Sequence, residues 1–183
     1  MQYLVRIVSW SQSLERIVGL NVDISVIYSV CIWGFGGHIC DHRGDFLHGY
    51  YGGSIDSSII HAEILALFHG LWLCLGFGYR KAACFSDATN VIDLVKSDRT
   101  VYHRYSSLIL ATKHLILDWN VELTHTLHEE NFATNNLAKL RTSPSSRLVV
   151  LEEPLLINLT FSLHMLWMWR IFVVSFFSSF SHL

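Results

Sequence analysis

The order of extended and helical segments constrains this 183-residue chain most strongly. Three segments rich in β-branched and aromatic residues, 21–33, 34–40 and 46–52, follow one another and predict an antiparallel meander. The second and third are joined at 41–44, where a final glycine favours a tight hairpin turn. Apolar residues at helical spacing then run from residue 60 to residue 75, with Ser57 or Ser58 as the expected N-cap.

The second half of the chain alternates strands with helices. We expect strands at 81–86 and 121–127, and helices at 88–96, 105–119 and 132–140. The order β-β-β-α-β-α-α-β-α predicts an α/β fold with a mixed five-stranded sheet. In this sheet three antiparallel strands are followed by βα units, and helices pack on it.

Composition narrows the class of protein. Charged residues make up 15% of the chain, below the roughly 25% of an ordinary domain, which excludes disorder over most of its length. A net charge of −2 excludes a strongly basic clamp that binds nucleic acid by charge alone. The four cysteines form no CxxC pair, so we expect buried free thiols in a reducing compartment. No signal-peptide pattern occurs in residues 1–20, and we expect an intracellular protein.

The last segment of the chain is unusually apolar. Between residues 155 and 183, 19 of 29 residues are apolar, and Arg170 is the only formal charge. This length suits a membrane anchor, but an arginine within a span costs about 2.5–3.5 kcal/mol, and we favour a tail without a membrane role. We therefore divide the chain into an N-terminal extension (1–17), a folded domain (18–141) and a hydrophobic C-terminal tail (142–183).

Three acidic residues stand where apolar residues are expected. Asp23 lies inside the first strand, and Glu63 lies on an otherwise apolar stripe of the first helix. Asp87 follows a buried strand, at the end where ligands gather in open α/β sheets. Three converging carboxylates would repel one another unless a hard cation such as Mg²⁺ neutralised them. Taken singly, Asp23 and Asp87 have ordinary alternatives, Asp23 in a turn or helix cap and Asp87 as a helix N-cap. A capping-box role for Glu63 would require Ile60 as the cap, and isoleucine cannot cap a helix.

These residues belong to a wider pattern that resembles the ribonuclease H type 1 domain, in the plant form attached to retrotransposon reverse transcriptases. The resemblance covers about residues 18–140, in order and with matching spacing. It is carried by the stretches LNVD (20–23), GFGG (34–37), DHRG (41–44), HAEILAL (61–67), LGFGY (75–79), FSD (85–87), HTLHEEN (125–131) and LAK (137–139).

The resemblance implies a site and an activity. Asp23, Glu63 and Asp87 fall on the three core metal-binding carboxylates of the family, and His125 falls on its histidine that moves a proton or helps product release. The fourth acid position of the family holds Asn135 in this chain. The family implies a two-ion Mg²⁺ site, with Mn²⁺ as a substitute, and hydrolysis of the RNA strand of an RNA–DNA hybrid. Recognition of such a hybrid depends on RNA 2′-hydroxyls in the minor groove.

Several departures from the family pattern bear on the turnover rate. Asn135 lacks the charge of the usual acid, His128 replaces an arginine, and Ile24 replaces a glycine. The alternative is therefore an RNase H fold with a weakened or inactive site that serves as a nucleic-acid or protein interaction module. The candidate phosphate contacts are four basic residues, for each of which an ordinary solvated side chain is the alternative: Arg80, Lys81, Lys96 and Arg99.

Overall fold

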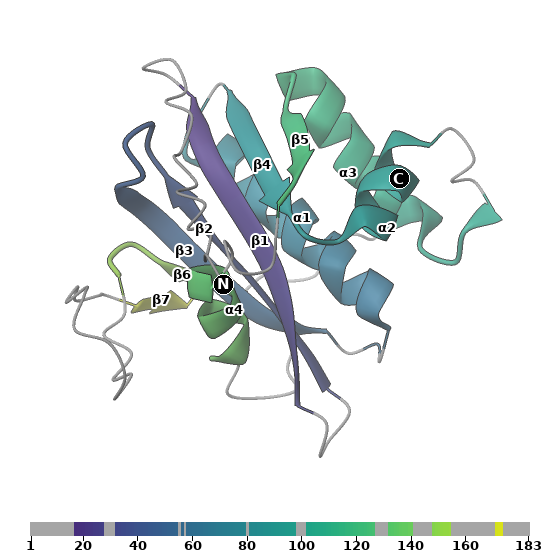
Figure 1. Ribbon diagram of the computed structural model, residues 1–183, viewed down its shortest axis with the longest axis horizontal. Coiled ribbons are helices and arrows are strands. Elements are labelled where there is room, and N and C mark those ends of the chain that lie inside the picture. Colours follow the sequence, from purple (N-terminus) through teal and green to yellow (C-terminus); the bar gives the residue numbers. More distant parts are fainter. Residues whose placement is uncertain are drawn as a thin grey trace, which may run out of the picture.

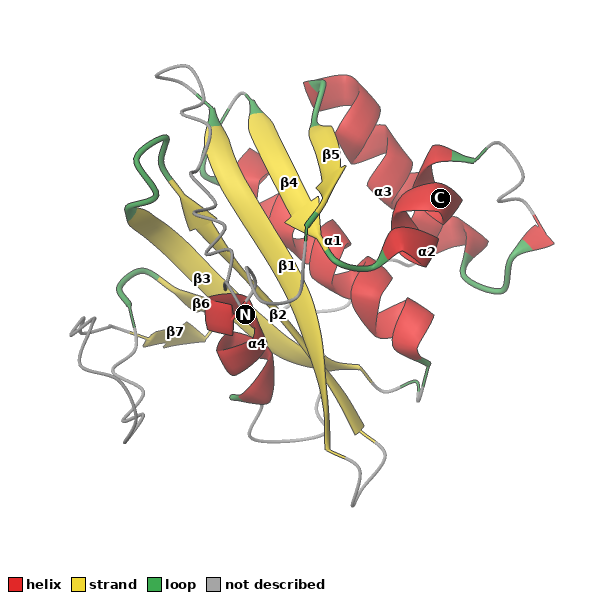
Figure 2. Ribbon diagram, viewed as in Figure 1, coloured by secondary structure: helices red, strands yellow, loops and turns green. Residues whose placement is uncertain are grey.

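The computed structural model describes residues 17–27, 32–54, 56, 58–79, 81–97, 102–126, 132–140, 148–154 and 171–173. Their helices and strands are shown in Figures 1 and 2. The strands are β1 (Val18–Ile27), β2 (Ile32–Cys40), β3 (Phe46–Ser54), β4 (Ala82–Ser86), β5 (Glu122–His125), β6 (Val149–Leu151) and β7 (Ile171–Val173). The helices are α1 (Ile59–Gly76), α2 (Thr89–Lys96), α3 (Ser106–Trp119) and α4 (Phe132–Lys139).

The strands form one mixed sheet in the order β5-β4-β1-β2-β3-β6-β7. β1, β2 and β3 are antiparallel neighbours, while β4 pairs parallel to β1 and β5 pairs parallel to β4. These five strands confirm the predicted α/β fold with its meander and βα units. The short strands β6 and β7 extend the sheet beyond β3, and both come from the range that we expected to be a tail.

The predicted bounds of the first strand were wrong. Instead of one strand over 21–33, β1 begins at Val18 and ends at Ile27, and β2 has already begun at Ile32. The sequence there runs on in Val, Ile and Tyr without glycine or proline, so its composition does not mark the end of β1. Residues 28–31 lie outside the described residues.

The hairpin turn between β2 and β3 is confirmed. Gly44 has a φ of +86°, a conformation that favours glycine, and its N–H donates to the carbonyl oxygen of Asp41 at 3.0 Å. The Asp41 carboxylate also accepts the backbone N–H groups of Arg43 and Asp45, at 2.8 and 2.9 Å.

Helices cover both faces of the sheet. α1 packs on one face with α2 and α3 beside it, and α4 packs on the opposite face against β1 and β2 (Figure 1). The main core lies between the sheet and α1 and is made by fully buried residues such as Leu20, Phe35 and Ile64. Because side chains alternate along a strand, Asn21 and Asp23 face the α4 side of β1, while Leu20 and Val22 join this core.

The helix α1 is the central helix of the described fold. Its N-cap is Ser58, one of the two predicted caps, whose side chain accepts the N–H of His61. Among the described residues α1 alone is long and apolar enough to cross a membrane by length and composition, and half of it is buried against the rest of the molecule. The residues 155–170 and 174–183 of the predicted tail lie outside the described residues.

Three of the four cysteines are described. Cys40, Cys74 and Cys84 are buried free thiols, as predicted, while Cys31 lies outside the described residues. Burial raises the pKa of the Cys74 thiol to about 12, so this side chain acts as an apolar packing group.

Candidate active site

Asp23 lies in the middle of the sheet on the face that α4 covers. The residue is 2% exposed, and its cross-strand partner on β2 is Gly36. One carboxylate oxygen, Oδ1, accepts the backbone N–H of Ile24 at 2.7 Å. The other, Oδ2, accepts the side-chain amide of Asn135 at 3.1 Å. Both oxygens of this buried carboxylate are therefore bound by donors within the chain.

Glu63 approaches the same region from α1. The residue is 7% exposed, and its Oε2 is a buried oxygen without a hydrogen-bond partner. Burial, followed by the negative charges of Asp87 and Asp23, raises the pKa of Glu63 well above its usual range. The negative charges of Asp87 and Asp23 thus both reach the Glu63 carboxyl group. The N-cap is Ser58, so Glu63 lies beyond the capping-box position, and the rejection of a capping role from the sequence is confirmed.

Asp87 and His125 lie where two parallel strands end. Asn21 of β1 pairs with Phe85 of β4, and Asp23 and Asp87 each follow two residues later. Ser86 at the end of β4 pairs with His125 at the end of β5, which brings His125 next to the Asp87 position. Neighbouring strands are about 4.8 Å apart, so the register places Asp23, Asp87 and His125 near one another across β1, β4 and β5. The N-cap of α2 is Ala88, which contradicts the alternative that Asp87 caps this helix.

Asn135 reaches the site from the first turn of α4. Its amide donates to Asp23 Oδ2 and, at 3.4 Å, to the carbonyl oxygen of Ile24. This close docking depends on Gly36, since a Cβ there would lie 2.8 Å from the backbone nitrogen of Ala138. The structure therefore gathers the candidate residues from β1, α1, the end of β4, the end of β5 and α4.

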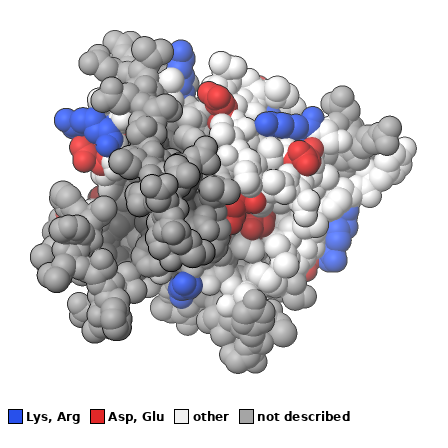
Figure 3. All heavy atoms as spheres, viewed as in Figure 1, with Lys and Arg blue, Asp and Glu red and all other residues white. Residues whose placement is uncertain are grey.

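The candidate residues supply oxygen atoms and negative charge, but they do not form a complete set of metal ligands in this structure. In the described part of the chain, no three His, Cys, Asp or Glu side chains form a group that could hold a metal ion as they stand. Acidic side chains nevertheless gather near the centre of the face in Figure 3, with Lys and Arg in scattered positions around them. A hard cation would reduce the repulsion between these carboxylates and would give the Glu63 oxygen a partner.

Sequence reasoning missed two polar residues that support this site. His38 of β2 contacts Asn21 at one ring nitrogen and Thr134 of α4 at the other, at 3.2 and 2.9 Å. The available signal was the strand alternation, which places His38 and Gly36 on the same face of β2. Thr134 gave no local signal, because its partner lies 96 residues away in the sequence.

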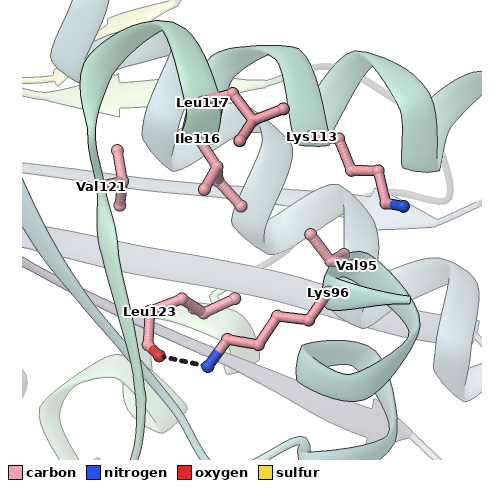
Figure 4. Close-up of a pocket in the computed structure, with 7 residues that line it drawn as sticks. All are labelled: Val95, Lys96, Lys113, Ile116, Leu117, Val121 and Leu123. Carbon is pink, nitrogen blue, oxygen red and sulfur yellow. Dashed lines mark hydrogen bonds between the residues drawn. The ribbon is translucent and has the colours of Figure 1, made fainter. Parts of the chain in front are cut away.

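A separate pocket of about 280 Å³ lies between α2, α3 and β5, and none of the five candidate residues lines it (Figure 4). Its walls are mainly apolar, and its two lysines are bound to backbone carbonyls. Lys96 donates to the carbonyl oxygen of Leu123 at 3.0 Å, and Lys113 donates to that of Ser97. Lys96 therefore joins α2 to β5 through this hydrogen bond, a role that we did not predict for it. Arg80 and Arg99 lie outside the described residues.

The mixed sheet with helices on both faces has the RNase H-like fold. The chain belongs to the reverse transcriptase-like family, whose profile matches residues 29–141. The match contains Glu63, Asp87, His125 and Asn135 and begins after Asp23, which the fold brings to the same site. No significant match was found among curated proteins.

Solved structures share the fold at low sequence identity. The N-terminal RNase H domain of a Mycobacterium tuberculosis protein superposes with a TM-score of 0.60 and 17% identity, over 67% of this chain and 91% of that one. RNase H1 of the halophilic archaeon Halobacterium salinarum superposes with a TM-score of 0.58 and 15% identity, over 67% of this chain and 97% of that one. LC11-RNase H1 is a protein isolated from compost and solved with an RNA/DNA hybrid. It superposes with a TM-score of 0.56 and 18% identity, over 66% of this chain and 92% of that one.

Proposed function

We propose that this protein is a metal-dependent endonuclease that hydrolyses the RNA strand of RNA–DNA hybrids. The observation that carries the proposal is the approach of three acids from β1, α1 and the end of β4: the charges of Asp87 and Asp23 both add to burial in raising the pKa of Glu63. Support also comes from membership in the reverse transcriptase-like family and from the fold shared with an RNase H1 solved with an RNA/DNA hybrid.

The proposed cofactor is Mg²⁺ at two positions, with Mn²⁺ as a substitute, and Asp23, Glu63, Asp87 and Asn135 would hold it. The fit rests on the partnerless Glu63 oxygen and on an all-oxygen donor set, which Mg²⁺ prefers. When bound, such ions make water more acidic and stabilise negative charge on the scissile phosphate. Asp23 and Asn135, two of the residues that would hold the cation, already contact each other through Oδ2 of Asp23 and the Asn135 amide.

The remaining chemistry falls to side chains at the strand ends. His125 is exposed at the end of β5, where its imidazole is open to solvent and can accept or deliver a proton. Burial of Asp23 and Glu63 keeps water away from their carboxyl groups and so strengthens their interaction with any cation. On the face drawn in Figure 3, the described Lys and Arg residues lie apart from one another, so binding of the hybrid relies on groove contacts such as the RNA 2′-hydroxyls.

The test is cleavage of an end-labelled RNA–DNA hybrid by the full chain over a Mg²⁺ titration. Asp23→Asn should lower the rate at least about a hundredfold, because it removes a buried negative charge from the cation site. Asp118→Asn, the same change at an exposed position of α3, should leave the rate unchanged. Single-stranded RNA, double-stranded RNA and double-stranded DNA are the substrate controls. A wild-type chain without metal-dependent cleavage of the hybrid would refute the proposal.

A second candidate function is favoured by the Asn135 amide, which occupies Asp23 where the family has a fourth acid. In this alternative the chain is a nucleic-acid or protein interaction module with a weakened site. Asn135→Asp distinguishes the two candidates in the same assay. Cleavage that appears only in Asn135→Asp would establish the interaction module for the natural chain, whereas cleavage by the wild type would support the enzyme.

A further inference from the structure

A partly buried chain of polar side chains connects the sheet to α4 next to the candidate site. His38 on β2 pairs in register with Asn21 on β1, which is two residues before Asp23 on the same face. The Asn21 amide donates to Nε2 of His38 at 3.2 Å, so the ring proton lies on Nδ1. That N–H then donates to the hydroxyl of Thr134 at 2.9 Å. The ring thus uses both nitrogens to join two strands to one helix.

Thr134 and its neighbour Asn135 bind α4 to two different strands. Thr134 is completely buried and contacts β2 through His38, while Asn135 donates to Asp23 and Ile24 of β1. Adjacent residues on a helix cannot move independently, so a shift at Thr134 carries the Asn135 amide with it. The position of this amide on Asp23 is therefore coupled to the His38–Thr134 hydrogen bond.

We propose that His38 is a positioning residue, which acts through Thr134 to hold the Asn135 amide against the Asp23 carboxylate. The catalytic consequence rests on the proposed nuclease function, whereas the geometric part stands without it. His38 has no nitrogen left for substrate, since both are bound within the chain. Burial also lowers the pKa of His38 to about 4, which keeps the ring neutral and its two hydrogen bonds constant near pH 7.

The decisive variant is Thr134→Val, which removes the hydroxyl and keeps the shape of the side chain. Thr134→Ser is the conservative variant that restores the hydroxyl. Thr112→Val is the matched control, because Thr112 is also completely buried, but its hydroxyl donates to Leu108 within α3 at 2.8 Å. The first readout is the pair of side-chain amide signals of Asn135 in ¹⁵N–¹H NMR spectra of the metal-free full chain, identified by their loss in Asn135→Asp.

Thr134→Val should shift these amide signals and lower kcat for hybrid cleavage about tenfold with little change in KM, because the amide is misplaced in bound enzyme as well. Thr134→Ser should restore both, and Thr112→Val should leave both at wild-type values. Asn135 signals that stay in place in Thr134→Val, or that move equally in Thr112→Val, would overturn the inference. Should Thr134→Val fail to fold, His38→Leu removes the same hydrogen bond and is judged by the same signals.

The two proposals fail separately. If the wild-type chain cleaves no hybrid, the nuclease proposal falls, while the Asn135 signals still decide whether His38 positions the amide. If cleavage is present and the signals do not respond to Thr134→Val, the nuclease stands and His38 has only a packing role.

Discussion

At the residue scale, Glu63 is a residue that lowers the stability of the fold but suits a metal site. The side chain is buried, one of its oxygens has no partner, and two other acids raise its pKa. A folded domain gains nothing in stability from such a group, because burial and like charges both oppose ionisation. Destabilising groups with perturbed pKa values are concentrated at functional sites, where they take part in binding or catalysis.

We predict that Glu63→Gln stabilises the metal-free protein at pH 7 by about 1–2 kcal/mol, because it removes the ionisation penalty. The pKa is raised in the folded state, so below the unfolded value of about 4.3 the carboxyl is protonated in both states and the penalty vanishes. As pH rises above that value, the unfolded chain ionises more readily and the penalty grows. The difference in the free energy of unfolding between variant and wild type, measured by urea denaturation, should therefore increase from pH 4 to pH 7.

Glu122→Gln on β5 is the control, since Glu122 is exposed and the substitution is identical. Added Mg²⁺ should raise the thermal midpoint of the wild type and have little effect on Glu63→Gln, because the ion binds the folded state through this carboxylate. A Glu63→Gln variant that is less stable than the wild type at pH 7 would show that Glu63 has a stabilising partner.

At the element scale, the docking of α4 decides whether the fourth candidate position reaches the site. The sequence predicts a helix at 132–140, close to the observed α4, but contains nothing that sets its distance from the sheet. That distance is set by Gly36, which lies opposite Asp23 and against the backbone of α4. A helix backbone can lie this close only where the strand below has no side chain.

We predict that Gly36→Ala lowers the free energy of unfolding by about 1–3 kcal/mol and reduces hybrid cleavage, because the new methyl group displaces α4 and its Asn135 amide. Gly76→Ala is the matched control, as Gly76 ends α1 with open space around its Cβ position. That change should be neutral or slightly stabilising, since alanine is the better helix former. Equal effects of the two substitutions in urea denaturation and cleavage assays would contradict the role of Gly36.

At the scale of the whole molecule, the core extends beyond the segment that resembles a known family. The family match ends at residue 141, yet Leu148, Val150 and Leu151 are 2%, 4% and 0% exposed. Leu151 packs with Tyr51 and Leu137, and the latter lies on α4. The strand β6 therefore supports the helix that carries Asn135, and the boundary of the folded unit lies later than the family resemblance indicates.

We predict that a chain ending at residue 141 is less stable by several kcal/mol than one ending at residue 154, because each fully buried apolar side chain contributes about 1.5–3 kcal/mol. Urea denaturation of the two chains measures the difference. In the full-length chain, Leu151→Ala should be destabilising by about 2–5 kcal/mol. Glu153→Ala, at an exposed neighbouring position, should have no effect. Equal stability of the two shortened chains would place β6 outside the core.

The sequence by itself determined the order of the elements and the positions of three acids. Strand alternation and helical spacing are local patterns, and they were enough to identify Asp23 and Glu63 as carboxylates on buried faces and Asp87 at a strand end. The end of β1 was not predictable, because an apolar run without glycine or proline contains no local stop. The added strands β6 and β7 depend on pairing with a distant edge, which short apolar segments do not specify.

Only the tertiary structure decided how Asn135, Thr134, His38 and Gly36 work together. Asn135 and Asp23 are 112 residues apart in the sequence, and His38 and Thr134 are 96 apart, so no local periodicity relates them. Their contacts exist because α4 folds back onto the face of β1 and β2 that carries the buried acid. Local chemistry thus placed the carboxylates, while long-range packing set which neighbours bind them and in what geometry.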